Sequence, residues 1–195
     1  MASAEPATGE LGETPLSATQ DRILSAALEL FGEHGVNGTS YQMVADTLGV
    51  TKAAIYHQFK TKDDIVIAVT ERELSKLGDA LAAAEAEKSH TKARELLLNA
   101  VVDHAVEHRR AASTLQFDPV IVRLLAAHKP FQLFVERLYR ALIGDDTGPE
   151  ARLDVAILSS TIGGTVVHPL AADIDEETLR ARLLHTARRI LGPSN

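Results

Sequence analysis

The feature that most constrains how this chain can fold is a tight turn, Gly49-Val50-Thr51, between two short stretches of helical pattern. Before the turn, Ser40 is a residue type that caps a helix start, and Gly49 can adopt the positive φ at which helices end. After the turn, Thr51 can cap a second helix that carries Ile55 on its inner face. So short a connection forces the two helices to pack at a steep angle, and residues 40–59 therefore predict a helix-turn-helix.

The remainder of the chain also has the pattern of helices. Leucine, alanine, glutamate and arginine are abundant, whereas turn-bounded runs of valine, isoleucine and threonine are scarce, so we expect no strand. Capping residues, prolines at first helical positions and apolar residues at helical spacing indicate where the helices lie. We predict an all-α chain of about nine helices, at residues 17–35, 40–48, 51–59, 61–87, 91–108, from 119, from 130, 151–164 and 176–191.

Three regions differ in character along the sequence. Residues 1–16 are acidic and broken by glycine and proline, and they predict a disordered tail. Residues 17–63 hold the short helices and are expected to form a small three-helix head. Residues 64–192 have longer helical patterns, interrupted by a loop-like stretch at 143–150, and are expected to form a second helical domain.

Composition removes several classes of protein. The chain has 20 lysines and arginines against 27 aspartates and glutamates, a net charge of -7 that does not suit a general polyanion binder. It has no cysteine, which excludes disulfides, thiolate metal sites and thiol chemistry. No apolar run is long enough to span a bilayer, and the first residues lack the basic and apolar parts of a signal peptide, so we expect a cytoplasmic protein.

Catalytic and metal-binding patterns are absent from the sequence. It contains no Gly-x-Ser-x-Gly, Walker loop, Gly-x-Gly-x-x-Gly or His-Glu-x-x-His, so we expect neither an enzyme nor a bound cofactor. His104 and His108 stand one helical turn apart and could face one metal ion, but no third ligand accompanies them. We interpret them as residues of a core or a cavity and predict no metal site.

The stretch around the turn resembles the DNA-binding domain of the tetracycline-repressor (TetR) family. Residues 38–66 read GTSYQMVADTLGVTKAAIYHQFKTKDDIV, and they follow without a gap the family's short helix, Gly-Val-Ser turn and Leu-Tyr-x-His-Phe segment. The matching positions are Thr39, Ser40, Ala45, Gly49, Val50, Thr51, Ile55, Tyr56, Phe59 and Lys62. Beyond about residue 70 the resemblance rests on length and helical character alone.

This resemblance implies a homodimer whose two reading helices bind a palindromic DNA operator, with a ligand cavity in each C-terminal domain. Carried over to this chain, the phosphate contacts fall on Thr39, Ser40, Tyr56, His57 and Lys62. The contacts to base edges fall on Gln42, Thr51, Lys52 and Ala53. Lys52 is the strongest candidate base reader, because a lysine can donate to guanine O6 and N7.

Two departures from the family pattern bear on how DNA would be read. Ala53 stands where the family has glycine and Ala54 where it has a polar residue, so direct readout rests on few side chains. Residues 19–65 hold four basic and six acidic side chains, which gives the head a charge of -2. Three of the four basic residues lie between 52 and 62, where a local positive strip can form. We predict weak non-specific binding with a shallow salt dependence.

The residues that share a helical face in the C-terminal half predict two further sites, a ligand cavity and a dimer interface. Apolar and aromatic residues with one histidine are expected to line a cavity for an apolar or aromatic effector; they are Leu97, Val101, His104, Phe131, Phe134, Leu138, Tyr139 and Ile157. Small residues of one helix and apolar residues of the last are expected to form the dimer interface; they are Ser160, Gly163, Gly164, Leu183, Ala187 and Ile190. The competing interpretations are plain core for the aromatic residues, and a glycine-weakened helix beside the cavity for the two glycines.

Three hypotheses follow, in this order. The first is a ligand-responsive transcriptional regulator, a repressor, that releases its operator when a small molecule fills the cavity, with the helix around residues 65–77 as the lever. The second is a helical ligand- or partner-binding protein with little DNA affinity, which the acidic head makes conceivable. The third, an enzyme with His104 or His108 as a base, ranks last.

Overall fold

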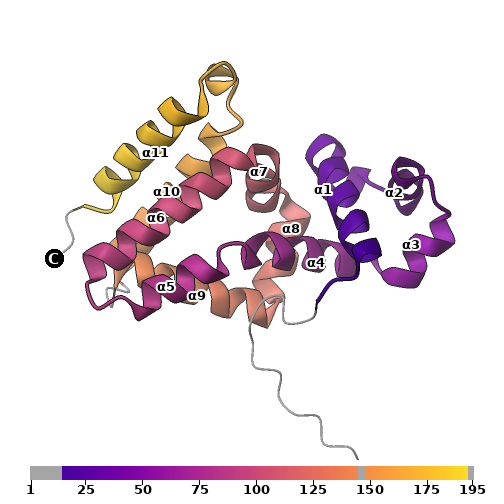
Figure 1. Cartoon of the computed structure of the whole chain (residues 1–195), viewed down its shortest axis with the longest axis horizontal. Helices are drawn as coiled ribbons and strands as arrows, with labels where there is room; N and C mark the ends of the chain where they lie inside the picture. The colour runs from indigo at the N-terminus through magenta and orange to yellow at the C-terminus, as the bar shows by residue number, and fades with distance from the viewer. Residues whose placement is uncertain (1–14, 145–147, 193–195) are drawn as a thin grey trace, which may run out of the picture.

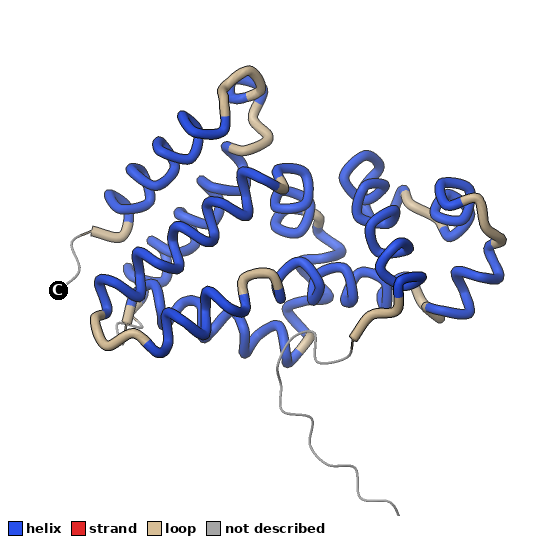
Figure 2. Tube along the Cα trace, in the orientation of Figure 1, coloured by secondary structure: helices blue, strands red, loops and turns tan. Residues whose placement is uncertain are grey.

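The computed structural model describes residues 15–144 and 148–192, and the regular structure in those ranges is entirely helical, as predicted (Figures 1 and 2). In chain order the elements are α1 (Ala18–Gly38), α2 (Tyr41–Leu48), α3 (Lys52–Gln58), α4 (Lys62–Ser75), α5 (Gly78–Ala86), α6 (His90–Glu107), α7 (Arg109–Phe117), α8 (Pro119–Ala127), α9 (Lys129–Ile143), α10 (Pro149–Thr165), the 3-10 turn η1 (Pro169–Ala171) and α11 (Glu176–Ile190).

In the described ranges, no helix is both long and apolar enough to cross a membrane. All but the last two residues of the tail predicted at 1–16, and the middle of the loop predicted at 143–150, lie outside the described residues.

The described ranges contain eleven α-helices rather than the nine predicted. The helix expected over 61–87 is divided at Lys76 and Leu77 into α4 and α5. The helix expected over 91–108 ends at Glu107, within one residue of its predicted end, and α7, which follows His108, is a helix that was not predicted. The break between α4 and α5 contains no proline, and the apolar spacing continues across it into Leu81. Sequence pattern therefore does not reveal this break.

Local signals place the helix starts where they were expected. The Ser17 hydroxyl accepts from the Gln20 amide at 3.2 Å, and the Gln20 side chain accepts from the Ser17 amide at 3.0 Å, which completes a capping box. Thr61 and Asp64 make the same reciprocal pair at the start of α4. Prolines occupy the first turn of α8, α9 and α10, where a missing backbone N–H costs nothing.

The helices pack around two apolar clusters. Figure 1 shows α1, α2 and α3 gathered at one end of the molecule, with α7 and α8 between them and α5, α6 and α11. The N-terminal cluster combines buried residues of α1 to α4 with Val120, Ile121 and Leu125 of α8. The C-terminal cluster is built from α5, α6, α9, α10 and α11. Because α8 completes the N-terminal core, the head is held against the rest of the chain; the domain boundary after residue 63 stays a prediction.

Candidate nucleic-acid interface and ligand cavity

The helix-turn-helix is built from local contacts around its turn. The Ser40 hydroxyl caps α2 by accepting from the Met43 amide at 3.2 Å. α2 ends at Gly49, which has φ 66°, a left-handed conformation that glycine adopts at little cost. The Val50 amide then donates to the Ala45 carbonyl at 3.0 Å and closes the turn. These bonds set the direction in which α3 leaves the turn.

α3 exposes nearly all of its side chains. Thr51 caps the helix by accepting from the Ala54 amide at 3.2 Å, and Ile55 is the one residue of α3 that is buried. The exposed residues are Lys52, Ala53, Ala54, Tyr56 and His57. A capping hydroxyl that accepts from the backbone keeps its own proton for donation, which suits a phosphate oxygen next to the helix start. The exposed surface of α3 is thus free to meet a partner.

A cation and two aromatic rings gather at the far end of α3. Tyr56 is exposed, the Lys60 ammonium lies 5.2 Å from the centre of its ring, and the Tyr41 ring lies 6.4 Å away. The Tyr41 hydroxyl donates to the Phe59 carbonyl at 3.2 Å, which anchors that ring. Lys60 was not among the predicted site residues; its place two residues before Lys62 in the basic stretch was the signal that could have found it.

Two residues predicted to hold phosphates also form hydrogen bonds at the junction of α1 and α2. Thr39 is buried, and its hydroxyl donates to the Gly35 carbonyl at 2.9 Å. The Lys62 ammonium donates to the carbonyls of Val36 at 2.9 Å and Thr39 at 3.1 Å. The Thr39 hydroxyl proton is therefore used within the protein, whereas the Lys62 ammonium keeps one of its three N–H groups, and a phosphate contact stays a prediction for both residues. Motif matching cannot separate these roles, because a residue that shapes the loop and one that touches DNA occupy equally fixed positions.

The other predicted DNA-contacting residues are exposed. They are Ser40, Gln42, Thr51, Lys52, Ala53, Tyr56 and His57. The Gln42 amide donates to Asp46 at 2.7 Å, so an acidic side chain of α2 stands beside it. Contact with DNA stays a prediction for each of these residues.

A cavity of about 260 Å³, which we call the interior cavity because buried and half-buried residues line most of it, lies among α4, α6, α7, α8, α9 and α10. The predicted residues Val101, His104, Phe131, Leu138 and Tyr139 line it. Leu97 and Phe134 pack into the surrounding core, and Ile157 is exposed on the outside of α10, which corrects the prediction for these three. On α10 the neighbouring Leu158 faces the cavity, because one residue along a helix turns the side chain by about 100°.

Glu73 is the charged residue of this cavity, and it was missed in the sequence. Its side chain is 1% exposed, and its carboxylate accepts from Arg72 Nη2 at 2.9 Å and from Lys76 Nζ at 2.7 Å. Burial acts to raise the pKa of Glu73, but the hydrogen bonds and charges of Lys76 and Arg72 outweigh it and hold the pKa below its usual value. Glu73 is therefore a carboxylate at neutral pH. An acid on the apolar stripe of α4, one turn after Val69, was the available signal.

His104 contributes a neutral polar group to the same cavity. Burial lowers the pKa of His104, and the neighbouring His108 lowers it further, while Glu73 acts in the opposite direction. The His104 and His108 rings are stacked with their centres 4.7 Å apart. Within residues 15–144 and 148–192, no group of three side chains is arranged to hold a metal ion.

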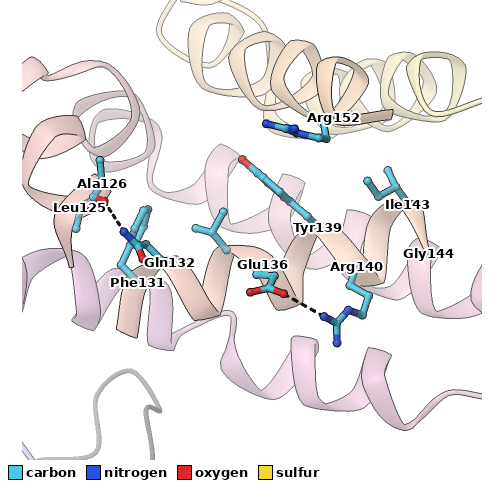
Figure 3. Close-up of a pocket in the computed structure, with 11 residues that line it drawn as sticks. Leu125, Ala126, Phe131, Gln132, Glu136, Tyr139, Arg140, Ile143, Gly144 and Arg152 are labelled. Atoms are coloured by element: carbon cyan, nitrogen blue, oxygen red, sulfur yellow. Dashed lines mark hydrogen bonds and ion pairs between the residues drawn. The ribbon is translucent and has the colours of Figure 1, made fainter. Parts of the chain in front are cut away.

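A second hollow, of about 640 Å³, opens to solvent beside the cavity (Figure 3). It runs along α9, which supplies Glu136 and Arg140, paired at 3.1 Å, and it faces Arg152 of α10. Figure 3 shows the Tyr139 side chain extending from α9 toward Arg152. The groove and the interior cavity adjoin, because both are lined by Leu125, Phe131, Val135 and Tyr139.

Several residues predicted for the dimer interface face the core of the chain itself. A Cβ atom on Gly163 would overlap the end of the Gln116 side chain, whose amide donates to Ser159 at 2.6 Å. Gly163 thus leaves room for the Gln116 side chain of α7 beside the cavity, in line with the competing interpretation given above. Leu183 and Ala187 are buried and Ile190 packs against the C-terminal cluster, whereas Ser160 is exposed and Gly164 half-buried.

The fold and the exposed reading helix define the class: a helix-turn-helix protein whose N-terminal head is joined to a larger helical part containing a cavity. Residues 23–69 match the family model described as bacterial regulatory proteins, tetR family. The N-terminal head therefore contains a domain of the TetR family of bacterial regulatory proteins.

Curated relatives are similar over the N-terminal part. The transcriptional regulator AcrR of Shigella flexneri is 34% identical over 95 residues, 47% of this chain and 44% of that protein. The transcriptional repressor AcnR of Corynebacterium diphtheriae is 28% identical over 72 residues, 37% of this chain and 38% of that protein. The matched region thus spans less than half the length of either relative.

Solved structures are similar over most of the chain. A regulatory protein of the tetR family from Rhodococcus RHA1 has a TM-score of 0.66 at 20% identity, over 92% of this chain and 100% of the other. AmtR of Mycobacterium smegmatis has a TM-score of 0.64 at 22% identity, over 94% of this chain and 90% of the other. At such identities the likeness establishes the fold. Where these relatives and neighbours carry a functional name, they are regulators and not enzymes.

Proposed function

We propose that this protein is a transcriptional repressor that binds a palindromic DNA operator as a homodimer and releases it when a small molecule occupies the interior cavity. The observation that carries the proposal is the exposed, capped α3 in a matched family domain, joined through a single helix, α4, to a buried cavity. The name of one relative, the repressor AcnR, supports repression over activation. The site of action would be the cytoplasm, where the operator lies.

In this proposal α3 enters the major groove. Lys52 at its first turn donates to guanine, while the free hydroxyl protons of Ser40 and Thr51 meet phosphates at two helix starts. Lys60 and Tyr56 add a cation and a ring at the other end of the helix. Few side chains read bases, so part of the specificity comes from the shape of the DNA.

The dimer would form through the outer faces of α10 and α11. Leu153 is 60% exposed and Ile157 52% exposed, one turn apart on α10, and Ser160 and Gly164 continue the same side of that helix. An apolar strip with small residues allows two copies of the helix to approach closely about a two-fold axis. The inward-facing Leu183 and Ala187 would support this interface from beneath.

α4 is suited to transmit a change in the cavity to the head. Its first residue, Lys62, is bonded to the α1–α2 loop, and its last turns carry Thr70, Glu73 and Leu74 on the cavity wall. A ligand that fits the cavity better when α4 is tilted would favour a spacing of the two α3 helices that no longer matches the operator. Differential affinity of about 1–3 kcal/mol is the usual scale of such coupling.

Selection from a library of random DNA duplexes, followed by sequencing, tests the proposal. We expect enrichment of an inverted repeat whose half-sites lie about one helical turn apart. Enrichment of no sequence at either low or physiological salt would contradict the proposal.

One observation favours a second candidate, a ligand- or partner-binding protein with little DNA affinity: residues 19–65 hold six acidic side chains against four basic ones. Such a protein would bind a ligand in the cavity but would select no duplex. The selection from random duplexes therefore distinguishes this candidate from the repressor.

A further inference from the structure

We propose that the interior cavity selects an apolar molecule with a cationic amine at one end, and that Glu73 is the residue that receives this end. The proposal rests on the repressor function proposed above and specifies the chemistry of its ligand. Arg72, which binds both Glu73 and α1, would transmit occupation of the cavity to the head.

The residue that supplies the carboxylate, Glu73, lies on the cavity wall, and the two residues whose cations neutralise it do not. Glu73 lines the cavity, whereas its partners Arg72 and Lys76 are absent from the lining. Oε1 accepts two bonds from Arg72, at 2.9 and 3.2 Å, while Oε2 accepts one from Lys76 at 2.7 Å. A carboxylate oxygen has two lone pairs, so Oε2 retains room for a further donor.

The other polar groups that line the cavity would not bind an anionic ligand. The Thr70 hydroxyl donates to the Val66 carbonyl at 2.9 Å, and the Gln116 amide donates to Ser159 at 2.6 Å. His104 is kept neutral by burial, which lowers its pKa. The described lining contains no lysine or arginine. A ligand carboxylate would therefore be buried beside a second carboxylate with no facing cation, which is strongly unfavourable.

The rest of the lining suits an apolar body. Leu74, Leu77 and Leu98 lie on the wall around Glu73 and His104, and Phe131 and Leu142 belong to the α9 side. An ammonium group with a short apolar body would place its charge at Glu73 and bury its carbon atoms among these side chains. Any donor to the Glu73 carboxylate forms a charge-assisted hydrogen bond, and an ammonium adds the direct attraction between opposite charges, so the ammonium dominates the selectivity.

Arg72 connects this anchor to the DNA-binding head. Its Nη2 binds Glu73, while Nη1 donates to the side chain and carbonyl of Asp21 at 3.0 Å each and to the Ser25 hydroxyl at 2.9 Å. Asp21 and Ser25 lie on α1. A ligand ammonium that binds Glu73 would compete with Arg72 for the carboxylate. Because Arg72 also bonds α1, weakening its bonds to Glu73 would change how α1 is attached to α4.

Three probes that differ only in their polar end test the ligand class: 4-phenylbutylamine, 4-phenylbutanol and 4-phenylbutyrate. Calorimetric titration of the full-length protein should give tightest binding for the amine, by about tenfold over the alcohol, with the carboxylate weakest. Glu73→Gln should remove the preference for the amine while leaving alcohol binding within about threefold, a change of well under 1.4 kcal/mol. Glu71→Gln, on the same helix but outside the cavity lining, is the matched control and should behave as the parent protein.

Equal affinity for the three probes, tighter binding of the carboxylate, or no binding of the amine at its solubility limit would overturn the proposal. The order of affinities in the parent protein is informative even if Glu73→Gln does not fold. Operator binding is measured separately on the selected duplex. Release of that duplex by an anionic compound alone refutes the ligand class and leaves the repressor function standing. If the protein binds the amine preferentially but selects no duplex, the ligand class is supported and the repressor function is refuted.

Discussion

The carboxylate of Asp118 accepts a hydrogen bond from the backbone amide of Val36 at 2.8 Å, although 82 residues separate the two in sequence. Its other oxygen accepts from the Val120 amide at 2.8 Å and caps α8. Gly35, just before Val36, has φ 69°, and a Cβ atom there would lie 3.4 Å from Asp118 Oδ2. One side chain thus joins the end of α1 in the head to the α7–α8 junction beside the cavity.

Replacement of Asp118 by asparagine should lower the free energy of unfolding by about 1–3 kcal/mol, because one amide, either Val36 or that of the α8 cap, loses its acceptor. Urea denaturation followed by circular dichroism measures the change. The exposed Asp173→Asn serves as the control and should unfold like the parent protein. Equal stability of the two variants would show that the Asp118 bonds contribute nothing.

Gly163 and Gly164 should respond differently to alanine. At Gly163 the new methyl group would overlap the Gln116 side chain, so we expect a loss of about 1–3 kcal/mol in unfolding free energy. At Gly164 the nearest atom, on Phe117, is 4.0 Å away, and the higher helix propensity of alanine should leave stability unchanged or raise it by up to about 1 kcal/mol. Thermal and urea unfolding check both. Similar effects at the two sites would contradict the close approach of α7 to Gly163.

Lys52 should contribute to operator binding, whereas Lys62 should contribute to the stability of the fold. Lys62→Met removes two hydrogen bonds to the α1–α2 loop and should cost about 1–2 kcal/mol of stability. Lys52→Met removes an exposed side chain, so stability should change by less than about 0.5 kcal/mol while operator affinity falls by about 1–3 kcal/mol. Urea unfolding and fluorescence anisotropy on the selected operator measure the two quantities. An unchanged operator affinity for Lys52→Met would remove Lys52 as a base reader.

Mild acid should destabilise the protein through His104. Burial lowers the pKa of His104 below 6.5, so the imidazole is neutral in folded and unfolded chains above that pH. Below pH 6.5 the unfolded chain takes up a proton that the folded chain resists, and stability falls as the pH falls toward the lowered value. His104→Asn should reduce this slope between pH 6.5 and the lowered pKa, whereas the exposed His185→Gln should not. Unfolding titrations across this range decide; identical slopes in all three proteins would refute the assignment.

The outer face of α10 should be needed for dimerisation. Ile157→Glu places a charge in the proposed interface and should give a monomer in light scattering, with weakened operator binding. Val122→Glu changes an aliphatic residue of similar exposure, 49% against 52%, on α8 and should leave the dimer intact. A dimeric Ile157→Glu protein would place the interface elsewhere.

The helix-turn-helix could be predicted from the sequence because its determinants are local. Ser40, Gly49 and Thr51 each satisfy or terminate backbone hydrogen bonds within four residues, and these bonds form whatever the rest of the chain does. The capped starts of α1 and α4 and the proline starts of α8 and α9 are of the same kind. The all-helical fold follows from such signals together with composition.

Only the tertiary structure decided which side chains meet across the molecule. Leu158 rather than Ile157 faces the cavity, because a shift of one residue turns a helical side chain by about 100° and neighbouring apolar residues look alike in sequence. Lys62 holds a loop, Glu73 becomes a buried carboxylate with two cationic partners, and Asp118 reaches Val36, because helices distant in sequence pack together. Local backbone bonding thus determined the elements, and long-range packing determined the chemistry of the cavity and its connection to the head.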